Sequence, residues 1–224
     1  MTESLPTIAI LGGTGALGAG LAMRWAKAGY SVTVGSRESA KAETAAESFN
    51  AKAGVDTIRG LDNPGAAAAS DIVVLTVPYA NHQRMLEAVK AAVQGKIFID
   101  VTVPLMPPKV RTVQLPEGGS AAKAAQRFLG DDVRVVSAFQ NVAADHLADL
   151  DHAIDCDVLV CGNDPAGREA VLTLVQAAGL RGWHAGRIDN STVAEALTSA
   201  LIFMNRHYGI DGAGIRITGE PTKK

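Results

Sequence analysis

The chain has 224 residues, and its 21 basic and 23 acidic side chains leave a formal net charge of -2. This balance, without a basic stripe, excludes an electrostatic reason to expect nucleic acid or a membrane surface as a partner, and favours small molecules. No stretch is long and apolar enough to span a membrane, and the amino terminus lacks a secretory signal. Cys156 and Cys161 are expected to be buried and reduced, so the sequence predicts a cytoplasmic protein without a disulfide.

A glycine-rich turn follows the first apolar run of the chain. The run at 8–11 predicts a buried strand, and residues 16–28 predict a helix of small side chains before a second strand begins. Between them, Gly13, Gly15 and Gly18 fit the G-x-G-x-x-G pattern, whose glycines allow a tight turn, a close pyrophosphate and close helix packing. This βαβ unit predicts a dinucleotide whose phosphates lie at the amino terminus of the helix.

The end of the second strand indicates which dinucleotide is bound. A carboxylate there would hydrogen-bond the ribose 2′-hydroxyl and repel a 2′-phosphate, but this chain has Ser36 and Arg37. The planar Arg37 guanidinium, the Ser36 hydroxyl and Lys41, one helical turn further on, suit a phosphate group. The pattern favours NADP(H) over NAD(H). The alternative is that Arg37 and Lys41 are solvated charges at a helix start, beside Glu38.

Strands and helices alternate along the rest of the chain. Apolar runs at 71–78 and 95–100 are typical of strands buried on both faces of a parallel sheet. We therefore predict an α/β fold with a doubly wound Rossmann-type parallel sheet and a small C-terminal region of helix and glycine tail. Residues 1–150 are expected to form the dinucleotide-binding domain, and residues 151–224 a smaller C-terminal part. Further strands are expected at 55–58, 133–139, 158–162 and 180–183, and helices at 38–50, from 62, and at 79–93, 120–129, 163–178 and 190–208.

Two segments interrupt this rhythm. Residues 101–119 contain four prolines and therefore cannot form a regular helix. Because they follow the carboxyl end of a strand, where open α/β sheets bind ligands, they are expected to form a lid or a pocket wall, with a plain surface loop as the alternative. Residues 143–157 are rich in Asp and His, but their spacing matches no metal-ligand template, and no metal site is predicted.

The last helix is expected to begin near Ser191, with Thr192 and Glu195 at capping-box spacing. Its apolar residues lie on two faces, which indicates a helix buried on two sides, and a second subunit is the natural second surface. We therefore predict a homodimer. The glycine-rich end at 209–215 allows close approach to a flat ligand or to a neighbouring subunit. One face carries Val193, Leu197, Leu201, Met204 and Tyr208, and the other carries Ala196, Ala200 and Phe203.

No usual acid–base constellation is present. The histidines are scattered, and none of the three tyrosines forms the Tyr-x-x-x-Lys pair that short-chain dehydrogenases need. An NADP(H) site without a proton-transfer residue favours hydride exchange with a second redox cofactor, so no catalytic side chain is predicted. Two alternatives stay open: an NADPH-dependent reductase of a flavin or another planar acceptor, and a protein that senses NADP(H) without turnover.

Residues 11–18 and 34–37 resemble the nucleotide-binding segment of the NADPH-dependent coenzyme F420 reductases, which pass a hydride between NADP(H) and a 5-deazaflavin. The resemblance continues at 71–78, 135–138 and 160–162 and in the C-terminal helix with its glycine tail, so it covers nearly the whole chain. It implies NADP(H) as cofactor, with coenzyme F420 as the co-substrate.

The resemblance also implies residue roles. Thr14, Ser36, Arg37 and Lys41 would hold the NADP(H) phosphates, and residues 76–78 would border the nicotinamide. The deazaflavin would lie over the nicotinamide, near residues 137–142 and the glycine tail. Residues 151–224 would complete this second pocket and form the dimer interface. Where the family commonly has a histidine, this chain has Gln140. The cofactor-binding residues expected are Gly13, Thr14, Gly15, Ala16, Leu17, Gly18, Ser36, Arg37, Lys41, Thr76, Val77, Pro78, Ser137, Ala138, Gln140 and Asn141.

Overall fold

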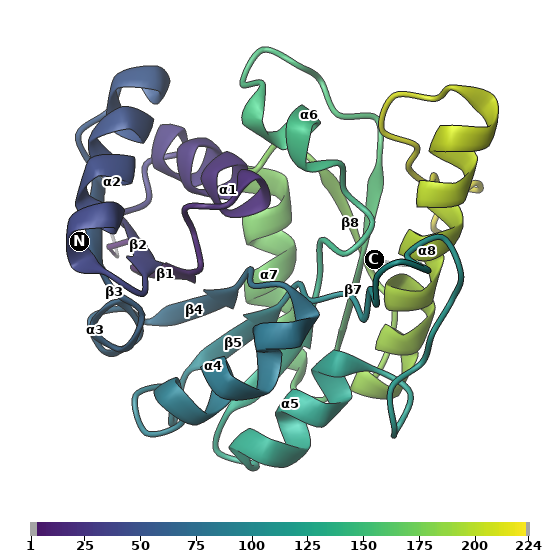
Figure 1. Cartoon of the computed structure of the whole chain (residues 1–224), viewed down its shortest axis with the longest axis horizontal. Coiled ribbons are helices and arrows are strands. Elements are labelled where there is room, and N and C mark those ends of the chain that lie inside the picture. The colour runs from purple at the N-terminus through teal and green to yellow at the C-terminus, as the bar shows by residue number, and fades with distance from the viewer. Residues whose placement is uncertain (1–3, 223–224) are drawn as a thin grey trace.

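The computed structural model describes residues 4–222. Residues 1–3, which belong to the amino-terminal segment expected to lack a secretory signal, lie outside the described residues, as do residues 223–224. One eight-stranded sheet runs in the order β3-β2-β1-β4-β5-β6-β7-β8, with helices on both faces (Figure 1). The strands are β1 (Ile8–Leu11), β2 (Val32–Ser36), β3 (Ile58–Asp62), β4 (Ile72–Leu75), β5 (Ile97–Asp100), β6 (Arg134–Ser137), β7 (Asp157–Gly162) and β8 (Arg181–His184). The helices are α1 (Ala16–Lys27), α2 (Ser39–Ala53), α3 (Asn63–Ala68), α4 (His82–Val89), α5 (Ala121–Leu129), α6 (Ala144–Ala148), α7 (Pro165–Ala177) and α8 (Ser191–Tyr208), with short 3-10 turns η1 (Tyr79–Asn81) and η2 (Ile188–Asn190).

The sheet is covered on both faces because its central strands are apolar throughout. In β1, Ile8 and Ile10 belong to one hydrophobic core, and Ala9 and Leu11 belong to the other. This division follows from the strand period, in which successive side chains point to opposite faces. Helices α1, α2 and α7 contribute to the first core, and α3, α4 and α5 to the second. The predicted doubly wound α/β fold is confirmed.

The last two strands run against the rest of the sheet. The first six strands in sheet order, β3-β2-β1-β4-β5-β6, all pair in parallel. Strand β7 is antiparallel to β6, and β8 is parallel to β7. The predicted parallel sheet therefore holds for six strands. A parallel neighbour needs a crossover that returns the chain to the opposite edge, but residues 138–156 contain only the five-residue helix α6. This connection leaves the Asp- and His-rich segment at the carboxyl edge of β6.

Some element bounds differ from the predicted ones. The strand predicted at 55–58 is β3, which begins at Ile58, where the Asn50 side chain bonds both the backbone N–H and the carbonyl of that residue. The helix predicted at 79–93 is η1 followed by α4, which already ends at Val89. The segment 101–119 contains no regular helix or strand, as its prolines predict.

The helix predicted at 120–129 has a side-chain cap, whereas the capping box predicted for the last helix is absent. Ser120 caps α5, because its Oγ accepts a hydrogen bond of 3.1 Å from the backbone N–H of Lys123. The capping box predicted from Thr192 and Glu195 is wrong, since Asn190 occupies the N-cap of α8 without a side-chain bond. The Glu195 carboxylate instead bonds the backbone at the start of α5.

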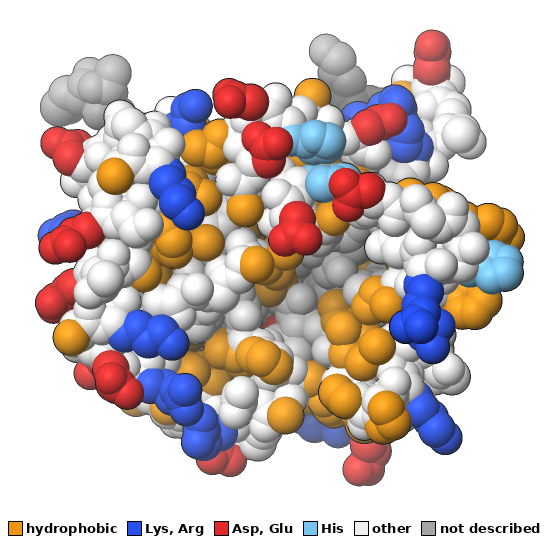
Figure 2. Space-filling view, turned by 45° about the horizontal axis from the view of Figure 1, so that its top comes forward, with side chains coloured by type: hydrophobic (Ala, Val, Ile, Leu, Met, Phe, Trp, Pro, Cys, Tyr) orange, Lys and Arg blue, Asp and Glu red, His pale blue; other side chains and the backbone are white. Residues whose placement is uncertain are grey.

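Helix α8 packs on the rest of the fold with one face only. Ala194, Ser199 and Leu201 are buried, whereas Val193 and Tyr208 are 61% and 67% exposed. The apolar stripe predicted from the sequence is therefore not one continuous face. Its exposed members Val193, Met204 and Tyr208 lie instead with Phe203 from the other face, and Figure 2 shows hydrophobic side chains gathered at the right-hand edge, where the carboxyl half of α8 lies.

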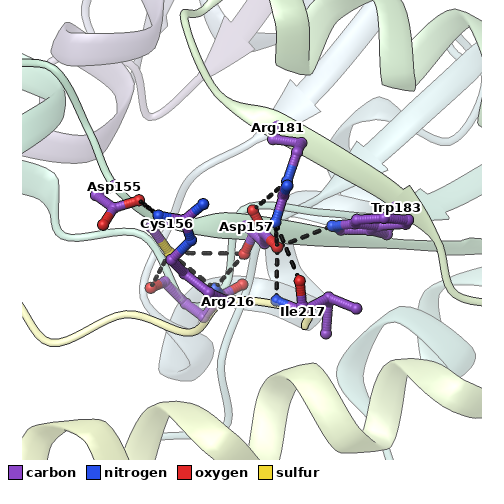
Figure 3. Close-up of polar contacts among 8 residues, drawn as sticks. Asp155, Cys156, Asp157, Arg181, Trp183, Arg216 and Ile217 are labelled. Carbon is purple, nitrogen blue, oxygen red and sulfur yellow. Dashed lines mark hydrogen bonds and ion pairs between the residues drawn. The ribbon is translucent and has the colours of Figure 1, made fainter. Parts of the chain in front are cut away.

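The chain after α8 lies alongside β7. The backbone N–H of Asp157 donates to the carbonyl of Ile215, and the N–H of Ile217 donates to the Asp157 carboxylate at 2.7 Å. Arg181 and Trp183 donate to the same buried carboxylate from β8, as Figure 3 shows. These donors hold the pKa of Asp157 at about 2, with the Arg181 hydrogen bond as the largest cause. The glycine tail is thus fastened to the sheet.

Candidate functional site: a dinucleotide recess and an apolar cleft

The three glycines of the turn after β1 are needed for different reasons. A Cβ on Gly13 would lie 2.7 Å from the carbonyl oxygen of Ile10, so the turn itself needs a glycine. A Cβ on Gly18 would lie 2.9 Å from Thr76 Oγ1, so close packing of α1 on the sheet needs a second one. A Cβ on Gly15 would meet its nearest atom beyond the adjacent residues at 3.6 Å. The fold therefore leaves space beside Gly15, the second glycine of the motif, where the motif predicts the pyrophosphate.

Helix α1 presents its free amino end to the same place. It begins at Ala16 without a side-chain cap and without an acidic residue in its first turn. Unpaired N–H groups and the positive end of the helix dipole therefore favour an anion there. Asn63 supports the turn from behind, because its Oδ1 accepts a 3.0 Å hydrogen bond from the N–H of Gly12. Sequence analysis missed Asn63, whose position at the start of a short helix gave no sign of this role.

A recess of about 290 Å³ continues from the turn to the end of β2. Ser36, Arg37 and Lys41 line it together, as the sequence predicts, and Arg84 of α4 adds a cation that the sequence did not indicate. Among residues 4–222, Arg37, Lys41 and Arg84 form no ion pair with a carboxylate, so their charges are available to an anion. Binding of a 2′-phosphate by this cluster stays a prediction.

A larger cleft of about 730 Å³ opens on the other side of the turn. Thr14, Ala16, Leu17 and residues 76–78 form one wall, which brings the predicted phosphate and nicotinamide residues together. The opposite wall includes Val103, Leu105, Pro107 and Val110, so the proline-rich segment is a pocket wall rather than a plain surface loop. Figure 2 shows a hollow near the centre of this face, with hydrophobic side chains on both sides.

The residues expected beside the second cofactor are not in this cleft. Ser137, Ala138, Gln140 and Asn141 are all buried at and beyond the end of β6. Gln140 Nε2 donates to the carbonyl of Asp100 at 2.7 Å and to Ser137 Oγ at 2.9 Å. Gln140 and Asn141 line a separate cavity of about 90 Å³ against α8. These four residues line neither the recess nor the cleft, and their contact with a cofactor stays a prediction.

Comparison with known proteins identifies the family. The family model for coenzyme F420-dependent NADP oxidoreductases matches residues 7–104. The F420-dependent NADP reductase of Methanocaldococcus jannaschii is 41% identical over 219 residues, which cover 94% of this chain and 97% of that relative. The chain belongs to this family. The F420-dependent NADP reductase of Methanothermobacter thermautotrophicus is 38% identical over 224 residues and is covered to 97%.

A solved structure supports the same assignment. The crystal structure of a candidate F420-dependent NADP reductase from Arthrobacter sp. FB24 has a TM-score of 0.80 and is 26% identical, covering 96% of this chain and 100% of that chain. The family resemblance stated from the sequence motifs is thereby confirmed. As in the sequence prediction, it extends over nearly the whole chain.

A buried polar pair lies beneath the cleft of this family member. His82 Nε2 is 2.7 Å from Asp100 Oδ2, and both side chains are at most 5% exposed. Sequence analysis treated His82 as one of several scattered histidines. No local signal reveals the pair, because the two residues are joined only when the ends of β4 and β5 come side by side.

No metal centre is apparent in the acidic connection after β6. The rings of His146 and His152 lie 4.3 Å apart, and His146 Nε2 is 3.7 Å from Asp211. Within residues 4–222, however, no three or more His, Cys, Asp or Glu side chains are placed to hold an ion together. The two cysteines, Cys156 and Cys161, are free and buried, as predicted.

Glu195 is a second buried acid that the sequence assigned to a different role. It projects from α8 to the start of α5, where its oxygens accept hydrogen bonds of 2.6 Å from Ala121 N and 3.1 Å from Ala122 N. Burial raises its pKa to about 8, with nearby Asp100 acting in the same direction, although the two backbone hydrogen bonds act against the shift.

This raised pKa predicts a pH-dependent stability. The ordinary pKa of Glu195 is 4.5 and the folded value is about 8, so the folded protein binds the proton more tightly than the unfolded chain does. Its free energy of unfolding is therefore expected to fall as pH rises through this range, by up to about 1.4 kcal/mol per pH unit from this group. Urea unfolding between about pH 5 and pH 8 measures the free energy of unfolding at each pH, and this free energy should fall less steeply with pH in Glu195→Gln than in the wild type. Equal slopes in the two proteins would contradict the raised pKa of Glu195.

Proposed function

We propose that this protein transfers a hydride between NADP(H) and the deazaflavin of coenzyme F420 by direct ring-to-ring transfer. The proposal is carried by one observation: the basic recess and the apolar cleft share Gly12, Thr14, Val77 and Pro78 in their walls. NADP(H) with its 2′-phosphate in the recess would place its nicotinamide ring in the cleft. The names of the relatives, all F420-dependent NADP reductases, support the identity of both cofactors.

The chain's own contribution to this reaction is placement. NADPH supplies the hydride when bound. Val77, Pro78, Val103 and Leu105 give the cleft apolar walls, which exclude water from the space between two stacked rings. The glycine turn and the amino end of α1 hold the pyrophosphate, so that binding energy far from the reacting carbons orients them. None of these roles requires a side chain that transfers a proton.

We further propose that the deazaflavin approaches from the side of β6. Gln140 and Asn141 support this placement, since their side-chain oxygens, Gln140 Oε1 and Asn141 Oδ1, accept no hydrogen bond in residues 4–222. A buried acceptor without a donor is unfavourable, and an N–H group of a polar ring whose edge entered the separate cavity lined by these two residues would satisfy it. In this scheme residues 1–150 hold NADP(H), and residues 151–224 complete the second pocket.

A homodimer is the third part of the proposal. Val193, Phe203, Met204 and Tyr208 leave an apolar face exposed on α8, and a second copy of the chain would cover it. The two free buried cysteines are compatible with a reducing compartment, and we place the enzyme in the cytoplasm. Sedimentation of the wild type and of Phe203→Glu tests the dimer: a monomeric wild type would contradict it.

The decisive test of the function is an anaerobic mixing experiment. The protein is mixed with NADPH and oxidised coenzyme F420, and the visible absorbance of the deazaflavin is followed, with free flavin run in parallel. Loss of deazaflavin absorbance that matches NADPH oxidation, and no comparable flavin reduction, is the expected result. Reduction of flavin alone would favour the second reductase class, and tight NADPH binding without turnover would favour a sensor.

A further inference from the structure

Asp100 connects three loops at the carboxyl edge of the sheet. Its side chain is fully buried at the end of β5. Asp100 Oδ1 accepts a 2.9 Å hydrogen bond from the N–H of Thr102, Oδ2 lies 2.7 Å from His82 Nε2, and its carbonyl oxygen accepts from Gln140 at 2.7 Å. The three partners belong to the segments that follow β5, β4 and β6. One acidic residue therefore fixes the relative positions of all three.

His82 passes this connection on to the wall of the cleft. The Tyr79 ring stacks on the His82 ring at an interplanar angle of 29°, with 6.1 Å between the centroids. Tyr79 lines the cleft beside Val77 and Pro78, and Thr102 lines it from the segment after β5. Asp100 thus holds one lining residue directly and another through His82.

We propose that His82 and Asp100 are positioning residues for hydride transfer, which fix the Tyr79 ring and thereby the width of the cleft where the two cofactor rings stack. The inference rests on the proposed function for the identity of those rings. Neither His82 nor Asp100 lines the cleft, so neither is assigned contact with a cofactor. Their effect reaches the reaction through Tyr79 and Thr102.

The geometry favours positioning because the demand on the cleft is one of distance. Hydride transfer depends on a separation of a few ångströms between two carbon atoms, and a misplacement of about 1 Å lowers such rates by about 100-fold. The buried His82–Asp100 bond fixes the His82 ring, since breaking it would leave a buried carboxylate without its partner. The Tyr79 ring therefore packs on a surface that does not move.

Three variants test the proposal: His82→Leu removes the donor, His82→Gln restores an Nε2 donor, and Asp100→Asn removes the negative charge. Single-turnover reduction of coenzyme F420 is measured with NADPH and with NADPH deuterated at C4. His82→Leu is expected to slow hydride transfer by about 10- to 100-fold, with the isotope effect fully expressed and the Kd for NADPH changed by less than about twofold. His82→Gln should recover part of the rate.

A second readout does not depend on the acceptor. The chain has three tyrosines, so carbon-13 labelling of their rings gives few NMR signals. In His82→Leu the Tyr79 signals are expected to shift and broaden, while those of Tyr30 and Tyr208 stay unchanged. Trp25→Phe is the control, because Trp25 does not line the cleft and the change removes a buried 2.8 Å hydrogen bond to the carbonyl of Leu174, so it should lower Tm without slowing hydride transfer.

The possible failures are distinct. A wild-type protein that leaves coenzyme F420 oxidised overturns the proposed function, whereas the labelled Tyr79 ring still reports on its support by His82. An unchanged Tyr79 signal in His82→Leu, or an unchanged transfer rate in a wild type that does reduce coenzyme F420, overturns the positioning proposal. A lowered Tm with an unchanged rate in the folded protein would make the pair purely structural.

Discussion

Gly15→Ala is expected to raise the Kd for both NADPH and NADH by at least about 100-fold while leaving the fold intact. The backbone of Gly15 has φ -77° and ψ 166°, which an alanine adopts without strain. The added Cβ would meet its nearest atom beyond the adjacent residues at 3.6 Å, so the protein has room for it. A pyrophosphate bound against this backbone would clash with the added methyl group, because that group occupies the space where the phosphate approaches the glycine. Titration with each dinucleotide, beside a thermal melt, measures the two effects separately.

Gly18→Ala provides the contrast to Gly15→Ala. A Cβ on Gly18 would lie 2.6 Å from Gly13 Cα, so the clash falls inside the protein rather than on the ligand side. This variant is expected to lose thermal stability first and dinucleotide affinity only as a consequence. A Gly15→Ala protein that bound NADPH normally would show that the pyrophosphate does not pass over this turn.

The parts of the fold that the sequence predicts correctly are the ones with local signals. The apolar runs of β1 and β4 and the glycines of the first turn each lie within a few neighbouring positions, and the hydrophobic period reveals them. The recess cations Arg37 and Lys41 were also predictable, since the position after β2 has a fixed relation to the motif. The proline-rich wall was predicted by its place after β5.

The parts that were missed depend on contacts between distant segments. Asn63 bonds Gly12 across 51 positions, and Arg84 lines the recess because η1 and α4 fold back beside the glycine turn after Pro78. Glu195 has the spacing of a capping box with Thr192, yet it accepts hydrogen bonds from two buried N–H groups at the start of α5, more than 70 residues earlier in the chain. Its choice between two helix starts is decided by tertiary packing, which a local pattern does not contain.

The reversal of β7 illustrates the same limit at the level of topology. The apolar run at 158–162 predicts a buried strand but carries no information on its direction. The direction follows from the connection before it, whose only helix within residues 138–156 is the short α6. The residues predicted beside the second cofactor, Gln140 and Asn141, fall at the start of this connection. Both side chains are buried, and neither lines the cleft.

Arg37→Ala is expected to raise the Kd for NADPH by about 10- to 100-fold and to change the Kd for NADH by less than about threefold, since a charge-assisted hydrogen bond contributes roughly 1.5–3 kcal/mol. Arg37 is exposed at the end of β2 and pairs with no carboxylate within residues 4–222, so its loss should leave the fold unchanged. Calorimetric titration with both dinucleotides measures the ratio directly.

Lys41→Ala and Arg84→Ala make the Arg37→Ala test more selective. If the three cations surround one phosphate, each single variant should weaken NADPH more than NADH, and the NADPH affinity of the wild type should fall steeply with salt. Arg37 is the planar donor among the residues at the end of β2 and should have the larger effect, because its guanidinium bonds two phosphate oxygens at once and an ammonium does not. An equal loss of both dinucleotides would instead make these residues solvated charges at the start of α2, the alternative that Glu38 kept open, and the preference for NADP(H) would then have to arise elsewhere in the recess.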